Sequence, residues 1–244
     1  MSERMSELER ILEEVKDADE VAAPTRKQFW KLVRQIKRER NPDRAEIKVA
    51  TKIRNILFER KTSRVYDLGW FLVGELVFGI LFGLVYVAAL NIPVSWFNIL
   101  SWGFFEIFVI LLRFFSLFAL IALWYPYGRL MAGTGYGIKF DGMYFSAQKE
   151  PGLKIEYESF LKAKPAKRKW FFFWSGLWTL IIAFGFGLLG WLFASDIIGF
   201  AISAVFLCFY GYVIGSGTPK NSRGEMGHYN REKKIESAWK ESID

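Results

Sequence analysis

Three ionisable residues stand where the sequence is otherwise almost wholly apolar: Glu75, Glu106 and Arg113. A carboxylate in such surroundings can bind and release a proton or a cation, and a nearby guanidinium can set its affinity. The same residue types can instead form a buried ion pair that fixes how helices pack. The sequence therefore leaves open a transport path and a purely structural role.

The elements that must position these charges are four apolar stretches, at residues 70–92, 97–124, 170–194 and 197–216. A helix needs about 20 residues to cross about 30 Å of hydrocarbon, and each stretch is about that long or longer. We therefore predict an all-α polytopic membrane protein with four transmembrane helices. The short connections within each pair predict two hairpins, at 67–124 and 170–216.

Depth along the helices predicts which charges meet. If the first span begins near Gly69 and the second ends near Trp124, Glu75 and Arg113 differ in depth by only about 7 Å. Two long side chains bridge that distance, so we expect Glu75 to pair with Arg113. Glu106 would lie on almost the same helix face as Arg113, about 10 Å further along.

The basic residues predict an orientation. Lysine and arginine crowd the segment before the first span and the loop 125–169, whereas the two short connections carry none. This bias places both termini and the loop in the cytoplasm of a multi-pass cell-membrane protein. Arg60, Arg64 and Asp67 would mark the membrane boundary before the first span. The basic flanks would attract anionic lipid headgroups, with nucleic acid as a much weaker alternative.

Residues 1–66 predict a cytoplasmic arm of short amphipathic helices. Such helices pack on each other or on the membrane surface, or they bind a partner. Asn41 and Pro42 are expected to cap and begin the third helix. The apolar residues recur at helical spacing in three stripes, namely Leu8, Ile11, Leu12 and Val15, then Phe29, Leu32, Val33 and Ile36, then Val49, Ile53, Ile56 and Leu57.

The loop 125–169 and the tail 217–244 contain no arrangement typical of catalysis. Glycines at 133, 135, 137 and 142 predict a loop, and the alternation from Met143 predicts a short strand or β-hairpin. The glycine spacing does not match a phosphate-binding loop. One cysteine and one histidine are too few for haem, iron–sulfur or zinc sites. We expect no catalytic residue, metal or cofactor, and therefore no enzyme.

Two segments carry a pattern of arginine, glycine and aspartate. Before the first span stand Arg60, Ser63 and Asp67, and after the second stand Gly133, Gly137, Gly142 and Phe145, with Lys139 among them. Over residues 58–146 this pattern resembles the RDD family of membrane proteins, for some of which cation/proton antiport is suggested. Gly135 and Ile138 replace the family's usual threonine and lysine, and its late aspartate has no clear counterpart, which weakens that implication.

Together these patterns predict ion or small-solute transport, or a subunit of a transport complex. Four helices enclose little space, so a homo-oligomer or a partner membrane subunit is expected. The alternative is a noncatalytic scaffold or assembly factor that recruits a cytoplasmic partner through the N-terminal helices.

Overall fold

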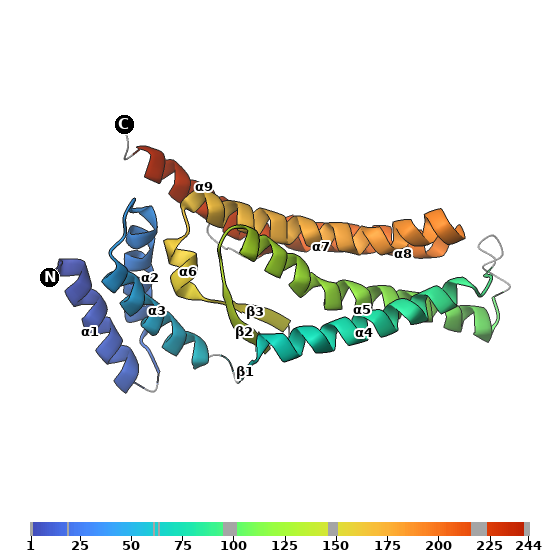
Figure 1. The fold of residues 1–244 in the computed structure, drawn as a ribbon, viewed down its shortest axis with the longest axis horizontal. Coiled ribbons are helices and arrows are strands. Elements are labelled where there is room, and N and C mark those ends of the chain that lie inside the picture. The colour runs from blue at the N-terminus through green and yellow to red at the C-terminus, as the bar shows by residue number, and fades with distance from the viewer. Residues whose placement is uncertain are drawn as a thin grey trace. The chain divides into compact units, whose positions relative to one another are not determined.

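The computed structural model describes residues 2–18, 20–60, 62, 64–94, 102–145, 151–215 and 224–241. Nine helices and three strands lie within these ranges (Figure 1). In chain order they are α1 (Glu3–Asp17), α2 (Ala23–Arg38), α3 (Arg44–Glu59), β1 (Val65–Tyr66), α4 (Leu68–Leu90), α5 (Phe104–Gly135), β2 (Phe140–Phe145), β3 (Pro151–Ile155), α6 (Tyr157–Lys162), α7 (Pro165–Ala194), α8 (Ile197–Gly215) and α9 (Gly224–Glu241).

Helices α4, α5, α7 and α8 are long and apolar enough to cross a membrane. Many of their large apolar side chains are exposed, among them Trp70, Phe104 and Phe193. Apolar surface on this scale is typical of contact with lipid rather than water. The four helices fit an integral membrane protein.

The chain forms two compact units. The bundle unit comprises Gly69–Ala132 and Phe172–His228 and holds most of the four apolar helices. The sheet unit comprises Met1–Leu68, Gly133–Phe171 and Tyr229–Asp244 and holds the strands and the N-terminal helices. The predicted arm 1–66 is thus one part of a larger unit that also draws on the central loop and the tail.

Helix α5 differs from the predicted second span. It begins at Phe104 rather than at residue 97, and it continues through Pro126 to Gly135. A proline is tolerated in an apolar helix when neighbouring groups satisfy the freed backbone carbonyl. The helix ends in a Schellman turn, in which Ile138 N–H donates to Gly133 O and Gly137 N–H donates to Thr134 O. Gly137 adopts φ +75°, so the glycine-rich stretch ends a helix.

Three antiparallel strands form a small sheet in the order β1-β2-β3. The predicted strand from Met143 lies within β2, which pairs with β3 on one side and with β1 on the other. A Cβ on Gly142 would lie 2.6 Å from the backbone oxygen of Tyr66, so only glycine permits this approach. The pairing joins the segment before α4 to the segment after α5.

The predicted N-terminal helices form, and the stripes of α1 and α2 are buried, whereas only Ile53 of the third predicted stripe is buried. Leu8, Ile11, Phe29 and Ile53 are among the fully buried residues. The stripes of α1 and α2 therefore serve packing within the protein. Helix α3 begins later than predicted, because Asp43 rather than Asn41 caps it and accepts a hydrogen bond from Ala45 N–H.

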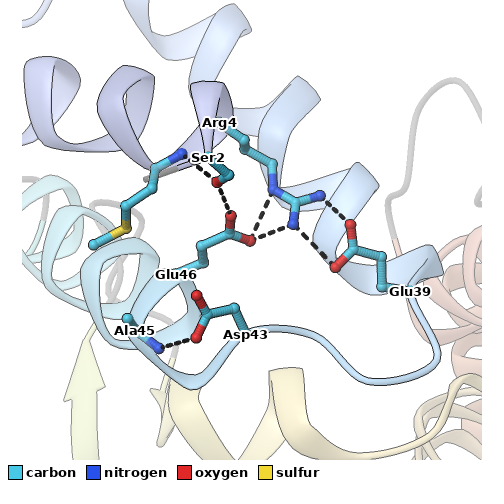
Figure 2. A network of polar contacts seen from close by, with 7 residues as sticks. Ser2, Arg4, Glu39, Asp43, Ala45 and Glu46 are labelled. Atoms are coloured by element: carbon cyan, nitrogen blue, oxygen red, sulfur yellow. Dashed lines mark hydrogen bonds and ion pairs between the residues drawn. The ribbon is translucent and has the colours of Figure 1, made fainter.

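A network of charged and polar side chains connects α1 to α3 and to the residue that follows α2 (Figure 2). Arg4 of α1 lies between Glu39 and Glu46, and its Nε donates to Glu46 over 2.8 Å. Ser2, which caps α1, donates to the other oxygen of Glu46 over 2.7 Å. Glu46 is buried, so these donors stabilise its charge.

The predicted tail 217–244 contains a helix that the sequence interpretation missed. Helix α9 spans Gly224–Glu241 and buries Ile235 and Glu232. Its acidic side chains bind basic residues of α2 and α7. The tail is therefore a structural part of the protein.

Candidate functional site

Among the described residues of the bundle unit, Arg113 binds a carboxylate and two backbone carbonyl groups. Its Nη1 donates to Asp196 Oδ1 over 2.6 Å, and both side chains are almost fully buried. Its Nε and Nη2 donate to Ala89 O, and Nη2 also donates to Ile92 O over 2.8 Å. Every nitrogen of the guanidinium thus has an acceptor, as a buried arginine requires.

The helix ends explain why these acceptors are available. Ala89 lies in the last turn of α4 and Ile92 just after it, where carbonyl oxygens have no partner four residues on; Ala89 O also accepts from Ile92 N–H over 3.3 Å. Asp196 lies in the two-residue connection between α7 and α8, where Ser195 takes φ 53°. A Cβ on Gly199 would lie 2.0 Å from Asp196 Oδ2, so this glycine makes room for the carboxylate.

The network also includes Tyr86, whose hydroxyl donates to Asp196 Oδ2 over 3.3 Å. Tyr86 comes from α4, Arg113 from α5 and Asp196 from the α7–α8 connection. A cavity of about 320 Å³ lies beside Arg113 and Asp196. Because Arg113 and Asp196 already bind each other, the arrangement is suited to holding helix ends together.

The predicted pairing of Glu75 with Arg113 is wrong, since Arg113 binds Asp196. The error comes from the assumed end of the second span near Trp124, because α5 continues to Gly135. Arg113 contacts Ala89, and about 21 Å of helix α4 separates Ala89 from Glu75. No side chain spans that distance.

Glu75 lies in α4, about 10 Å along the helix from Leu68. It is 6% exposed, and its Oε2 has no hydrogen-bond partner among the described residues. Tyr127 of α5 lies within electrostatic reach of it and donates its hydroxyl proton to Leu72 O. An unpartnered carboxyl oxygen in an apolar helix is costly, which makes Glu75 the strongest candidate for binding a proton or cation.

Glu106 lies in the same helix as Arg113 and seven residues before it, as predicted, but close to the start of that helix. It lies in the first turn of α5 and is half-buried. Its Oε2 folds back to within 3.1 Å of where a Cβ of Gly103 would stand. A carboxylate in the first turn is stabilised by the helix dipole, so Glu106 needs no partner deep in the bundle.

No protein-family model, curated protein or solved structure matches this chain. The resemblance to the RDD family therefore stays a prediction. The two segments that carry it are joined in the structure, because β1 and β2 pair at Val65 with Tyr144 and at Tyr66 with Met143.

The predicted boundary residues have separate local roles. Arg60 ends α3, and its guanidinium donates to Val15 O of α1. Arg64 lies 6.0 Å from the ring of Tyr66. Asp67 directly precedes α4, at the position of a helix cap. Ser63 lies outside the described residues.

The sheet unit contains a buried charge cluster that the sequence interpretation missed. Glu232 of α9 binds Lys37 Nζ over 2.5 Å and Arg168 Nε over 2.8 Å, and all three side chains are buried. Arg168 also donates to Ala163 O and Lys37 O. Arg168 stands in a lysine-rich flank, where nothing in the sequence distinguishes it from solvated neighbours.

The pKa values of this cluster follow from burial and charge. Burial lowers the pKa of Lys37 to about 8, against the attraction of Glu232. Burial opposes ionisation of Glu232, but the charges of Lys37 and Arg168 outweigh it and hold its pKa at about 2. Glu232 is therefore ionised throughout the physiological range.

Within the described residues, no group of three or more His, Cys, Asp or Glu side chains is placed to hold a metal ion. Cys208 is free and exposed on α8. The chemistry that these side chains offer is proton or ion binding at Glu75 and charge pairing elsewhere.

Proposed function

We propose that this chain acts in ion or small-solute transport across the cell membrane, with Glu75 as the group that exchanges a proton or cation. The observation that carries the proposal is the buried Glu75 carboxyl, which has one oxygen without a partner among the described residues. An ionised carboxylate in hydrocarbon needs a neutralising partner, and a bound proton or small cation supplies one. In this proposal Arg113 has a structural role only, because its guanidinium is already paired with Asp196.

The proposed transporter works as a homo-oligomer or with a partner membrane subunit. Apolar side chains fill the interior of the bundle unit, among them Leu117, Leu120, Ile121 and Phe206. These residues leave little room for water within one copy, so a second subunit would complete a path beside Glu75. The distribution of basic residues supports cytoplasmic termini.

The test is flux in reconstituted vesicles. Purified full-length protein in liposomes with an internal pH dye is given a proton or cation gradient. We expect Glu75→Gln to abolish flux while the thermal unfolding temperature changes little, because glutamine keeps the shape and removes the exchangeable charge. Glu106→Gln is the matched control and should retain flux. Equal flux in wild type and Glu75→Gln would show the proposal to be wrong.

A noncatalytic scaffold is the second candidate, and one surface of the sheet unit favours it. A cavity of about 410 Å³ is bordered by Trp30, Phe58, Arg26 and Arg54, and Trp30 is 42% exposed. An aromatic side chain among arginines suits an acidic partner segment. Under this alternative, the wild-type protein shows no flux. A partner co-purifies with wild type, and Trp30→Ala abolishes its binding.

A further inference from the structure

A second cavity of the sheet unit, of about 620 Å³, gathers four lysines: Lys139, Lys162, Lys164 and Lys167. They come from the turn after α5, from α6 and from the start of α7. Residues far apart in the chain therefore place positive charge around one hollow. We call it the lysine pocket.

Backbone hydrogen bonds fix the walls of the lysine pocket. Lys139 N–H donates to Ser159 Oγ over 2.9 Å, and Ser159 Oγ donates to Glu156 O. Glu156 N–H in turn donates to Lys139 O over 2.9 Å. The turn after α5 is thereby held against α6, so the pocket is formed before any ligand binds.

The charges of the lysine pocket are only partly balanced. Lys162 binds Glu158 over 2.5 Å, and Glu156 is the other carboxylate of the lining. Lys139, Lys164 and Lys167 form no ion pair with a described residue. Three exposed ammonium groups thus remain around the hollow. An anion with several oxygens, such as a phosphate group, is the ligand that suits them.

The position of the lysine pocket points to the source of the phosphate. Lys167 lies in the first turn of α7, about 4.5 Å along the helix from Trp170. Trp170 is 39% exposed and begins the apolar part of this candidate membrane span. Tryptophan at the start of an apolar span is typical of the headgroup level of a bilayer. If Trp170 lies at the headgroup level, Lys167 lies within reach of lipid phosphates.

We propose that the lysine pocket binds the phosphate of an anionic glycerophospholipid in the leaflet where α7 begins. Lys139, Lys164 and Lys167 supply the charge, and Ser159 holds the wall that carries Lys139. This proposal is independent of transport at Glu75, because it concerns a different unit and a different ligand.

Native mass spectrometry of the detergent-solubilised full chain tests the proposal by titration with phosphatidylglycerol and with phosphatidylcholine. We expect wild type to retain phosphatidylglycerol preferentially. The triple variant K139Q/K164Q/K167Q should bind it at least about tenfold more weakly, since each basic residue near a lipid surface contributes substantially. The variant K27Q/K31Q/K52Q removes the same charge elsewhere in the sheet unit and should bind as wild type does.

The triple variant K139R/K164R/K167R keeps the charge and should keep the lipid, and an unchanged thermal unfolding temperature of K139Q/K164Q/K167Q excludes misfolding as the cause of its loss. Equal retention by the pocket and control glutamine variants would overturn the proposal. Displacement of phosphatidylglycerol by inorganic phosphate at equal concentration would also overturn it, because the pocket would then take a soluble phosphate.

Discussion

A guanidinium is stable in an apolar interior only when its donors are all satisfied, and Arg113 and Arg168 meet this condition in similar ways. Each binds one carboxylate and the carbonyl oxygens at a helix end or loop. The carbonyl contacts matter because the attraction between the two buried charges does not by itself offset the free energy lost when both are removed from water. Both arginines therefore fix where a neighbouring helix ends.

The Arg113–Asp196 pair should make the bundle unit sensitive to loss of one partner. We expect Asp196→Ala to lower the stability by about 3 to 5 kcal/mol, since it leaves a buried charge without a counter-ion. Thermal unfolding in detergent measures this change. The double variant Arg113→Met with Asp196→Leu should recover much of the loss, because it removes both charges. A single variant as stable as wild type would contradict the structural role.

The Lys37–Glu232 contact predicts that stability rises with pH in two separate ranges, one acidic and one alkaline. The pKa of Glu232 is about 2 when folded and ordinarily 4.5, so its ionisation stabilises the fold above pH 4.5. This contribution is lost as the pH falls through about 2. The pKa of Lys37 is about 8 when folded and ordinarily 10.5, so stability should rise between these values.

Unfolding curves measured across pH distinguish the two groups. Glu232→Gln should remove the acid-side loss. Lys37→Met should flatten the alkaline rise and also reduce the acid-side loss, because Lys37 is one of the two charges that lower the pKa of Glu232. An alkaline rise that persists in Lys37→Met would assign it to another group.

At the scale of elements, apolar composition and spacing predicted a great deal. The spans 70–92, 170–194 and 197–216 closely match α4, α7 and α8, because length and hydropathy alone identify a helix in lipid. The stripes of α1 and α2 are buried as their spacing indicates. Helix ends were less predictable, since Pro126 does not stop α5 and a glycine can end a helix as readily as begin a loop.

The predicted pairing of Glu75 with Arg113 depended on the assumed end of the second span, and it was wrong because that end was wrong. Once α5 extends beyond Trp124, Arg113 moves away from Glu75 and toward the end of α4. One signal could have identified the true partner, because Asp196 is a carboxylate between two apolar helices with no loop to carry it into water. The sequence gives no such signal for the cluster around Glu232, because Lys37, Arg168 and Glu232 each lie in a stretch that is rich in charged residues.

The sheet depends on the close approach of β1 to Gly142. We expect Gly142→Ala to destabilise the sheet unit by about 1 to 3 kcal/mol, because the added methyl group would collide with Tyr66 O. Gly135→Ala is the matched control, as nothing lies within 4 Å of its added Cβ and alanine favours the helix. Thermal unfolding of both variants checks the difference, and equal stability would contradict it.

At the scale of the whole molecule, the two compact units predict two stability responses rather than one. Glu232→Gln should speed hydrogen exchange in α2 and α9, whereas Asp196→Ala should speed it near the ends of α4 and α8. Mass spectrometry of exchanged peptides measures both. Uniform acceleration along the whole chain in either variant would show that the units unfold as one.

Asp196 reaches Arg113 across 83 residues of chain, and this separation has a consequence for biosynthesis. The ribosome completes α4 and α5 long before it makes Asp196, so Arg113 enters the bilayer without its counter-ion. Until Asp196 is in place, Nη1 of Arg113 lacks its carboxylate, while Nε and Nη2 can still donate to the carbonyl oxygens of Ala89 and Ile92. Neutralisation of the Arg113 charge therefore waits for the synthesis of the α7–α8 connection.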